Sequence, residues 1–360
     1  MKKSLTLLIT CVFLLMIILT GCGGTDTASS GTEKKSGNNS SGKDVIEWNF
    51  SIWGGARAWT YPVEDWAKAM SEQTDGKWKI NIHYGEALGP AAEQLDGLSN
   101  GLFEAAAIAP FYTPGKLPLQ QVMDLPFISP LDHKELMELL MAVWDHPEIK
   151  KEMDSWNIKP LFPGMPTQYE YMGVKKIEKA EDFKGVKISG MSAEQGQVFE
   201  LFGAVPTPMP APELYSSLER GTIDGAIFPY SYTFGSYNLF EVAKYNTVGI
   251  AAGSPISTFF VNKDAWEALP DDFKQMHETY VKDVFMDNSI KYYEEADKKW
   301  IKEFEDKGVE IITLPKEERQ KFLDKSQVVW DKWVEQWKDR GPTQEILDFV
   351  LEKRKEISGF

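Results

Sequence analysis

Cysteine and histidine are scarce in this sequence. Its 360 residues include two cysteines and four histidines. Cys11 lies inside an apolar N-terminal run and Cys22 follows that run directly, so the rest of the chain has no thiol for a disulfide, a nucleophile or a metal. The histidines lack the spacing of metal ligands and are His83, His133, His146 and His277. We therefore expect no metal centre.

Motifs of catalysis and of cofactor binding are also missing. The sequence has no HExxH, no GxSxG, no P-loop and no GxGxxG before a predicted helix. Two carboxylates across a cleft need no sequence motif, so a cleft hydrolase remains a remote alternative. We predict a protein that is not an enzyme and that holds no cofactor.

Basic residues are too few to balance the acidic ones. The chain has 39 lysines and arginines against 54 aspartates and glutamates, which gives a formal net charge of -15. Nucleic acids and anionic membrane surfaces attract basic proteins. We therefore expect no nucleic-acid partner, while a small ligand in a cleft stays compatible with this charge.

The N-terminus has the form of a bacterial export signal. Lys2 and Lys3 precede the apolar run Leu5–Leu19, which is too short to span a bilayer comfortably. The run ends in Leu-Thr-Gly-Cys, which resembles a lipobox and implies cleavage before Cys22 and a lipid on its sulfur. Residues 22–43, rich in Gly, Ser and Thr, then form a flexible tether. We expect an extracytoplasmic lipoprotein anchored to the cell membrane; a secretory signal with an incidental cysteine is the alternative.

The first part of the body alternates strands and helices. Strands are predicted at 45–53, 77–84 and 105–109, with helices at 61–74 and 91–100. This alternation is typical of a parallel, doubly wound sheet. Ligands in such sheets lie at the carboxyl ends of the strands, which points to Trp53–Arg57 and to Pro110–Tyr112.

A second α/β segment runs from Asp182 to Pro229. It contains DFKGVKIS (182–189) and GAVPTPMPAPELYSSLERGTIDGAIFP (203–229), with strands at 186–189 and 223–228 around a helical turn at 214–218. The strand ends indicate Ser189–Ser192 and Phe228–Tyr232. We expect loops from both halves to face one cleft.

These motifs, together with ALG (87–89), DLPF (124–127) and EVAKY (241–245), resemble the solute-binding proteins of TRAP transporters, the C4-dicarboxylate-binding family. The resemblance implies a two-domain, periplasmic-binding-protein-like (type II) fold, with open sheets, a cleft between the domains and a long helix under both. The helical pattern at 271–307 fits that helix. It also implies the permease subunits of a TRAP transporter as membrane partners.

The predicted first domain comprises residues 44–166 with about 250–288. The second comprises 167–249 with about 289–360, and residues 1–21 are the signal. We expect a monomer that binds a small-molecule solute by hinge closure.

The family's ligand-clamping arginine is replaced in this chain by Ser189. A hydroxyl cannot meet a carboxylate with two charged hydrogen bonds. Phe228 stands where relatives often carry asparagine, and Ala211 lies near a usual phenylalanine. With Met165, Met191 and Met209 nearby, the resemblance implies a more apolar site than one for a dicarboxylate.

Arg57 is the one arginine in the predicted strand-end loops, and we hypothesise that it supplies the missing cation; a surface arginine stacked on Trp59 is the alternative. Aromatic side chains crowd the same loops: Trp53, Trp59, Phe111, Tyr112, Tyr169, Tyr171, Phe228, Tyr230, Tyr232, Phe234 and Tyr237. Glu170, between two tyrosines, is a candidate to receive an amine, although a solvated strand residue is the simpler interpretation. The predicted ligand-binding residues are Trp53, Arg57, Phe111, Glu170, Ser189, Met191, Phe228 and Tyr230.

We predict a solute-binding protein that delivers its ligand to a TRAP-type permease. A monocarboxylate with an apolar or aromatic body is the first candidate ligand. An amine or a neutral polar solute comes second and a C4-dicarboxylate third. A sensor subunit that presents its ligand to a receptor is the alternative within binding proteins.

Overall fold

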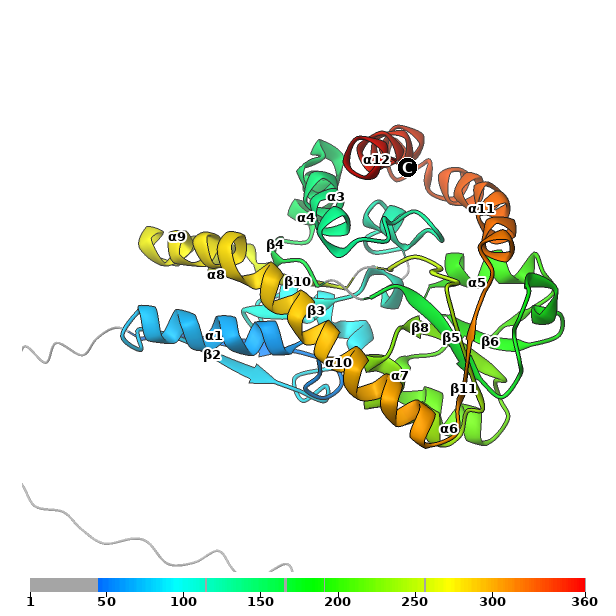
Figure 1. The fold of residues 1–360 in the computed structure, drawn as a ribbon. Coiled ribbons are helices and arrows are strands. Elements are labelled where there is room, and N and C mark those ends of the chain that lie inside the picture. The colour runs from blue at the N-terminus through cyan, green and yellow to red at the C-terminus, as the bar shows by residue number, and fades with distance from the viewer. Residues whose placement is uncertain (1–44, 114, 165–166, 191, 256, 360) are drawn as a thin grey trace, which may run out of the picture. The chain divides into compact units, whose positions relative to one another are not determined.

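The computed structural model describes residues 45–113, 115–164, 167–190, 192–255 and 257–359. The predicted signal, the lipidation site Cys22 and the tether lie outside the described residues, as do Met165 and Met191. Residues 44–360 belong to one unit, and they build two β-sheets (Figure 1). We call each sheet with the helices that pack on it a lobe, the first lobe holding β1 and the second holding β5.

The first sheet has the strand order β2-β1-β3-β10-β4. β1 runs parallel to β2 and β3, whereas β10 is antiparallel to both β3 and β4. The sheet is therefore mixed and not purely parallel, because a strand from far along the chain enters its middle. Its strands are β1 (Ile46–Ser51), β2 (Trp78–His83), β3 (Ala105–Ile108), β4 (Ile158–Phe162) and β10 (Thr258–Asn262).

The helices of the first lobe follow the predicted apolar spacing. α1 begins with a proline in its first turn and buries Val63, Trp66 and Met70, which lie three and four residues apart on one face. The other helices are α2 (Gln94–Ser99), α3 (His133–Asp145), α4 (Pro147–Ser155) and α8 (Lys263–Glu267), and α1 itself spans Tyr61–Gln73.

The second sheet has the order β11-β9-β5-β8-β6-β7. β6 is parallel to β7 and β8, and β5 is antiparallel to β8 and β9. Its strands are β5 (Tyr169–Gly173), β6 (Lys187–Gly190), β7 (Val205–Pro206), β8 (Gly225–Pro229), β9 (Tyr245–Val248) and β11 (Glu310–Thr313). The helices between them are α5 (Ala193–Glu200), α6 (Leu214–Glu219) and α7 (Tyr232–Ser236).

Two chain segments cross between the sheets side by side. One leads from β4 to β5 and the other from β9 to β10. Tyr169 joins them, because its N–H donates to the Gly253 carbonyl (3.1 Å) and its carbonyl accepts from the Ala252 N–H (3.1 Å). Ser129 reinforces the pair from a third segment, since its Oγ accepts from the Ser254 N–H at 2.8 Å. The two lobes therefore meet at a paired backbone connection.

A long helical segment contacts both lobes. It consists of α9 (Asp271–Tyr280), a π-helical turn (Val281–Phe285) and α10 (Met286–Asp306), and it runs diagonally across Figure 1. Its middle reaches the first lobe, where the Tyr292 hydroxyl donates to Asp65 Oδ2 at 2.8 Å. Its end reaches the second lobe, where Phe304 packs on Phe240. The predicted helix at 271–307 is thus present, with a wider turn inside it.

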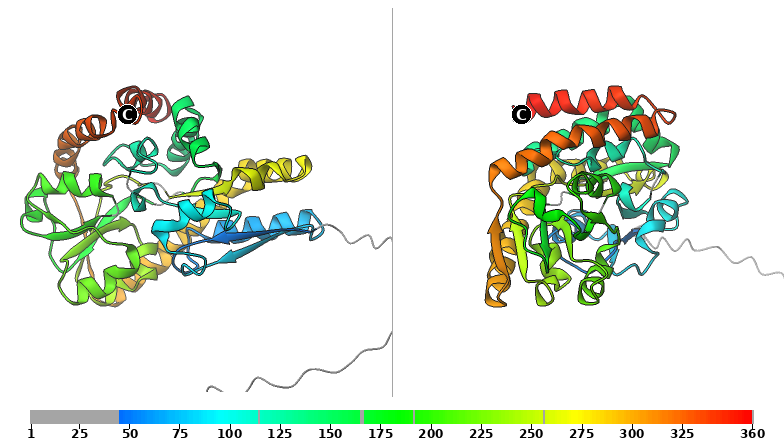
Figure 2. Two further views of the ribbon diagram at one scale, coloured as in Figure 1. Left: turned by 180° about the vertical axis from the view of Figure 1, so that it is seen from behind. Right: turned by 90° about the vertical axis from the view of Figure 1, so that its right-hand side faces the viewer.

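The last two helices connect the lobes a further time. α11 (Lys316–Trp337) packs on α5 in the second lobe, and α12 (Thr343–Ser358) packs on α3 in the first. Figure 2 shows α11 and α12 side by side. The predicted second domain included residues 289–360. The last helix of that range, α12, packs on the first lobe.

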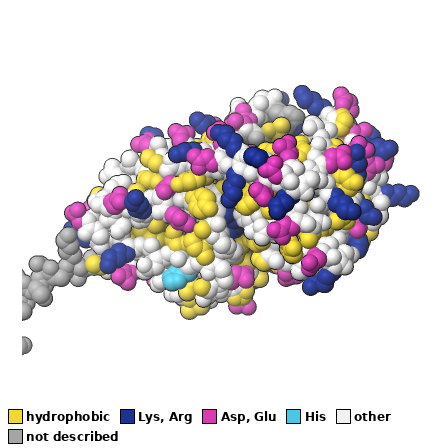
Figure 3. All heavy atoms as spheres, turned by 60° about the horizontal axis from the view of Figure 1, so that its bottom comes forward, with side chains coloured by type: hydrophobic (Ala, Val, Ile, Leu, Met, Phe, Trp, Pro, Cys, Tyr) yellow, Lys and Arg dark blue, Asp and Glu magenta, His cyan; other side chains and the backbone are white. Residues whose placement is uncertain are grey.

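The described helices give no sign of a membrane span, since each is too short or too polar to cross a bilayer. On the face in Figure 3, acidic and basic side chains are interspersed and do not gather by sign.

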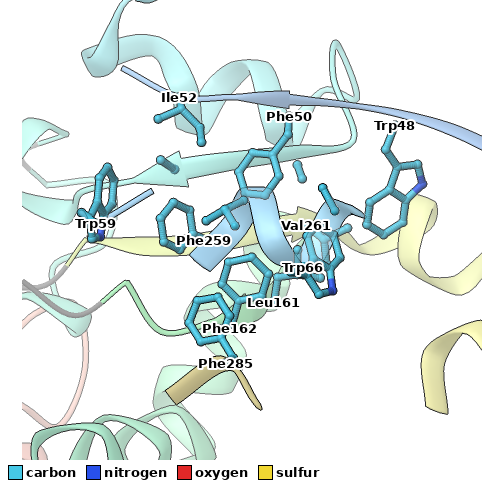
Figure 4. Close-up of a cluster of buried hydrophobic side chains, with 14 of the residues drawn as sticks. Trp48, Phe50, Ile52, Trp59, Trp66, Leu161, Phe162, Phe259, Val261 and Phe285 are labelled. Carbon is cyan, nitrogen blue, oxygen red and sulfur yellow. The ribbon is translucent and has the colours of Figure 1, made fainter. Parts of the chain in front are cut away.

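Aromatic rings fill the core of the first lobe (Figure 4). Phe162 lies at its centre, with ring centroids 4.4 Å from Phe285 and 5.2 Å from both Trp66 and Phe259. These four rings come from β4, the π-helical turn, α1 and β10. One side chain therefore holds the long helix against the sheet.

We expect Phe162→Ala to lower the free energy of unfolding by about 3–5 kcal/mol, because it removes a ring that is 1% exposed and leaves a cavity. Denaturant unfolding measures this change. Leu102→Ala is the control, since Leu102 is 75% exposed and its truncation should cost less than about 0.5 kcal/mol. Equal effects of the two substitutions would contradict the packing described.

Candidate ligand-binding site

A small cavity, with a volume of about 20 Å³, lies where the carboxyl ends of β1 and β8 approach each other. Such strand ends are the usual place for a ligand in open α/β sheets. Its walls come from the loop after β1, from β8 and α7, and from the crossing segments. The lining residues are Trp53, Arg57, Trp59, Tyr169, Ala211, Phe228, Pro229, Tyr232, Thr233, Tyr237 and Ser257.

Arg57 is held in place by its own loop. Its backbone N–H donates to Thr60 Oγ1 (3.0 Å), and its carbonyl accepts from the Thr60 N–H (2.7 Å) at the start of α1. Its guanidinium turns back on the loop, where Nη1 donates to the carbonyls of Gly55 (2.6 Å) and Trp53 (3.2 Å). The side chain therefore has a fixed direction beside the cavity.

The charge of Arg57 lacks a counter-ion in the described part of the chain. The residue is 6% exposed, and no carboxylate of the described residues forms an ion pair with it. Its guanidinium lies 4.8 Å from the centre of the Trp59 ring. This contact resembles the stacking that we considered as the alternative, yet the arginine is buried and not on the surface. A buried charge without a partner is costly, so the position favours an anion from outside the chain.

The cavity walls are mainly aromatic. Trp53 and Trp59 lie 5.0 Å apart, and Trp59 stacks on Phe259 at 4.7 Å. On the side of the second lobe, the rings of Tyr169 and Phe228 are nearly parallel at 6.5 Å. A flat, apolar solute body would therefore contact rings from both lobes.

Tyrosine hydroxyls surround the guanidinium. Burial raises the pKa of Tyr112 and that of Tyr232, so both stay protonated and neutral. The Tyr112 hydroxyl accepts from the Ala211 N–H at 3.5 Å. The Tyr237 hydroxyl is shielded from solvent and has no hydrogen-bond partner among the described residues. The polar groups at the cavity are thus one cation and several neutral donors.

Three of the predicted ligand-binding residues line this cavity together, namely Trp53, Arg57 and Phe228. Phe111 is buried behind it, with its ring 4.7 Å from Tyr112. Ser189 is fully buried on the neighbouring strand β6, and its Oγ has no partner in the described part of the chain. Tyr230 lies beside the cavity without lining it, and its N–H donates to the Gln168 carbonyl.

Some lining residues had no signal in the sequence. Thr233 lies on α7, which is too short for a periodic pattern, whereas Tyr237 at its end belongs to the aromatic set named from the sequence. Pro229 ends β8, and Ser257 precedes the inserted strand β10. The position of β10 in the sheet was not predicted, so Ser257 was not recognised.

Glu170 points away from the cavity and holds a crossing segment. Its carboxylate accepts from the N–H groups of Ile250 (2.9 Å) and Ala251 (3.2 Å), where Ala251 has a positive φ of 44°. Arg319 of α11 donates to the carbonyl of the same Ala251 at 3.4 Å. Burial raises the pKa of Glu170 to about 7, although the backbone donors and Arg319 oppose this change. Its partners in the structure are backbone groups of the connection between the lobes.

The raised pKa of Glu170 links stability to pH. Between its ordinary pKa of 4.5 and about 7, the folded state holds a proton that the unfolded chain has released. This contribution to stability is fully present below about pH 4.5 and is lost as the pH rises through about 7. Glu170→Gln stays neutral throughout. We expect its stability relative to the wild type to rise by about 2 kcal/mol from pH 5 to pH 8, as urea unfolding at the two pH values measures.

The control for this prediction is Glu93→Gln, because Glu93 is exposed and water hydrates its charge in both states. It should show no gain with pH. A constant difference between Glu170→Gln and the wild type at both pH values would show that the buried carboxyl does not titrate in this range.

The chain belongs to the DctP family of bacterial extracellular solute-binding proteins, family 7, whose model matches residues 52–336. Among its relatives is the ectoine-binding periplasmic protein TeaA of Halomonas elongata. The two are 26% identical over 276 residues, which cover 74% of this chain and 77% of TeaA. The chain is a periplasmic solute-binding protein of the TRAP type.

Solved structures share the fold. A TRAP solute-binding protein from a marine metagenome, specific for aromatic acid ligands and bound to metahydroxyphenylacetate, has a TM-score of 0.77 and 20% identity; 87% of this chain and 99% of that chain are covered. A TRAP solute-binding protein from Rhodoferax ferrireducens with copurified benzoate also has a TM-score of 0.77, with 21% identity over 88% and 99% of the two chains. The predicted two-domain type II fold is thereby confirmed, and neither the hydrolase nor the sensor alternative is favoured.

Proposed function

We propose that this chain captures a monocarboxylate with an aromatic or apolar body and delivers it to the permease subunits of a TRAP transporter. Arg57 binds the carboxylate, and the rings of Trp53 and Phe228 enclose the body of the solute. TRAP binding proteins work with membrane permease subunits, so transport follows from the family, whereas the ligand class rests on the cavity.

The observation that carries the proposal is the buried charge of Arg57, which has no counter-ion among the described residues. A guanidinium at 6% exposure keeps few water contacts, and only its Nη1 has acceptors among the described residues. A solute carboxylate would offer hydrogen bonds to the remaining N–H groups in a low-dielectric site, where a charged bond is strong. A neutral solute would leave the charge uncompensated.

The residues on the opposite wall argue against a dicarboxylate. The second lobe offers Phe228 and Ala211 to the cavity, and Ser189 behind them carries no charge. Among the lining residues, Arg57 is the one cation. A second carboxylate would therefore be buried against aromatic rings without a cation to balance its charge, which is costly.

The relatives and solved structures bind varied ligands, which include aromatic acids, uronates, orotic acid and ectoine. The two structures named above hold metahydroxyphenylacetate and benzoate, both aromatic acids with one carboxylate. TeaA is named for ectoine, and an amine or a neutral polar solute is the second candidate for this chain. Glu170 was the residue proposed for that case, but it already accepts two backbone hydrogen bonds outside the cavity.

Closure of the lobes fits this arrangement. Trp53 and Arg57 belong to the first lobe, while Phe228 and Tyr237 belong to the second. A solute that contacts both sets gains more in the closed form and shifts the population toward it. We further propose that the protein acts as a monomer and that a lipid on Cys22 anchors it outside the cytoplasm, close to its permease.

The first test is a thermal-shift screen of aromatic acids, amines, neutral solutes and succinate. A ligand at a hundred times its Kd adds about 2.7 kcal/mol of stability. We expect the largest shifts from benzoate and phenylacetate, and none from succinate. Stabilisation by amines or neutral solutes alone would contradict the proposed ligand class.

The substitution Arg57→Gln tests whether Arg57 binds the carboxylate of the ligand. We expect the affinity for benzoate to fall by about 30-fold or more, because a desolvated charge partner is lost. Isothermal titration calorimetry measures the change. The matched control is Arg220→Gln, which removes an exposed arginine and should leave the affinity unchanged. If Arg57→Gln keeps its affinity within a factor of two, Arg57 does not bind the ligand.

A further inference from the structure

Two polar atoms from opposite lobes converge on Gly54. A Cβ at Gly54 would lie 2.7 Å from the Tyr237 hydroxyl and 2.9 Å from Arg57 Nη1. Its positive φ of 68° also suits glycine and strains other residues. The absence of a side chain at this position therefore lets a second-lobe hydroxyl approach a first-lobe guanidinium.

Within the described part of the chain, the Tyr237 hydroxyl finds no hydrogen-bond partner. Buried hydroxyls in proteins are almost always hydrogen-bonded, and an unpaired one costs about 1–3 kcal/mol. This hydroxyl lies inside the cavity lining and has no hydrogen-bond partner among the described residues. The position thus points to a partner that the chain itself does not provide.

The backbone of α7 holds Tyr237 firmly. The Tyr237 N–H donates to the Thr233 carbonyl at 3.1 Å at the end of the helix. Behind it, Gly235 lies so close to Trp300 of the long helix that a Cβ there would be 2.0 Å from the indole ring. Tyr232 on the same helix stacks on Tyr293 at 5.6 Å. The hydroxyl is therefore presented by a helix that cannot easily shift.

We infer that the Tyr237 hydroxyl and the Arg57 guanidinium form one anion subsite, assembled across the lobes at Gly54, that takes the carboxylate of the solute. This inference rests on the proposed function. A carboxylate accepts several hydrogen bonds and satisfies a guanidinium and a phenol at once. A carboxamide has one acceptor oxygen and no charge, so its hydrogen bonds to these two donors are weaker than those of a carboxylate.

This arrangement gives the carboxylate a role in closure as well as in affinity. Opening the lobes would separate Tyr237 from Arg57, and the charge would then keep only the first-lobe contact. The carboxylate is thus the group that distinguishes the closed form from the open one. Solutes that fill the aromatic walls but lack the charge should bind without fully closing the protein.

The test uses benzoate and benzamide as probes with the wild type and Tyr237→Phe, by calorimetry. Removal of the hydroxyl should lower the affinity for benzoate at least 10-fold and change the affinity for benzamide less than 3-fold. Tyr215→Phe is the control, because it removes from a half-buried tyrosine outside the cavity lining a hydroxyl that donates to Glu241 at 3.4 Å. It should alter neither affinity.

Small-angle X-ray scattering measures the radius of gyration. Its change on binding should not depend on Tyr237 if that residue only supports the structure. At saturating benzoate the wild type should contract, and Tyr237→Phe should contract less. If Tyr237→Phe loses the same fraction of its affinity for benzoate and for benzamide, the side chain only shapes the cavity. That result would overturn the inference.

The two proposals fail separately. If Arg57→Gln loses its affinity for benzoate while Tyr237→Phe binds benzoate as tightly as the wild type, the proposed function stands and the shared subsite is wrong. If the wild type does not bind benzoate in calorimetry, the proposed ligand class fails and the subsite fails with it.

Discussion

The backbone pairing of Tyr169 with Ala252 and Gly253 is the constraint on which the two lobes depend. It joins the first residue of β5 to the crossing segment that leads to β10. Because strand side chains alternate between faces, it also sends Tyr169 to the cavity and Glu170 to the opposite side. The ligand site and the connection between lobes therefore share one short stretch of backbone.

The two faces of β5 therefore bury charges of opposite sign, Arg57 on the cavity side and Glu170 on the other. On the cavity side, a cation is buried without a carboxylate. On the other side, a carboxylate is buried among backbone donors, and Arg319 is near enough only to moderate the effect of burial on its pKa. Charge is thus kept away from the second-lobe wall, where Phe228 and Ala211 leave an apolar surface.

Local patterns allowed much of the fold to be predicted. The spacing of Val63, Trp66 and Met70 gave α1, and the long apolar period after Asp271 gave the helix under both lobes. Strand ends pointed to Trp53 and Arg57, because ligand sites follow the carboxyl ends of strands. What escaped prediction depends on distant contacts. Neither the insertion of β10 nor the packing of α12 on α3 has a local signature, and the alternation around Glu170 does not say which face of β5 meets the ligand.

The π-helical turn at Val281–Phe285 divides the long helix into two parts, α9 and α10, whose side chains are rotated differently about the helix axis. A helix advances by about 100° per residue, so one additional residue in a wider turn rotates everything after it by about that angle relative to what came before. α9 can therefore keep Phe273 stacked on Trp78, while α10 keeps Trp300 and Phe304 against the second lobe. Deleting one residue there would restore a regular α-helix. The contacts of either α9 or α10 would then be lost, so a regular helix is incompatible with packing on both lobes.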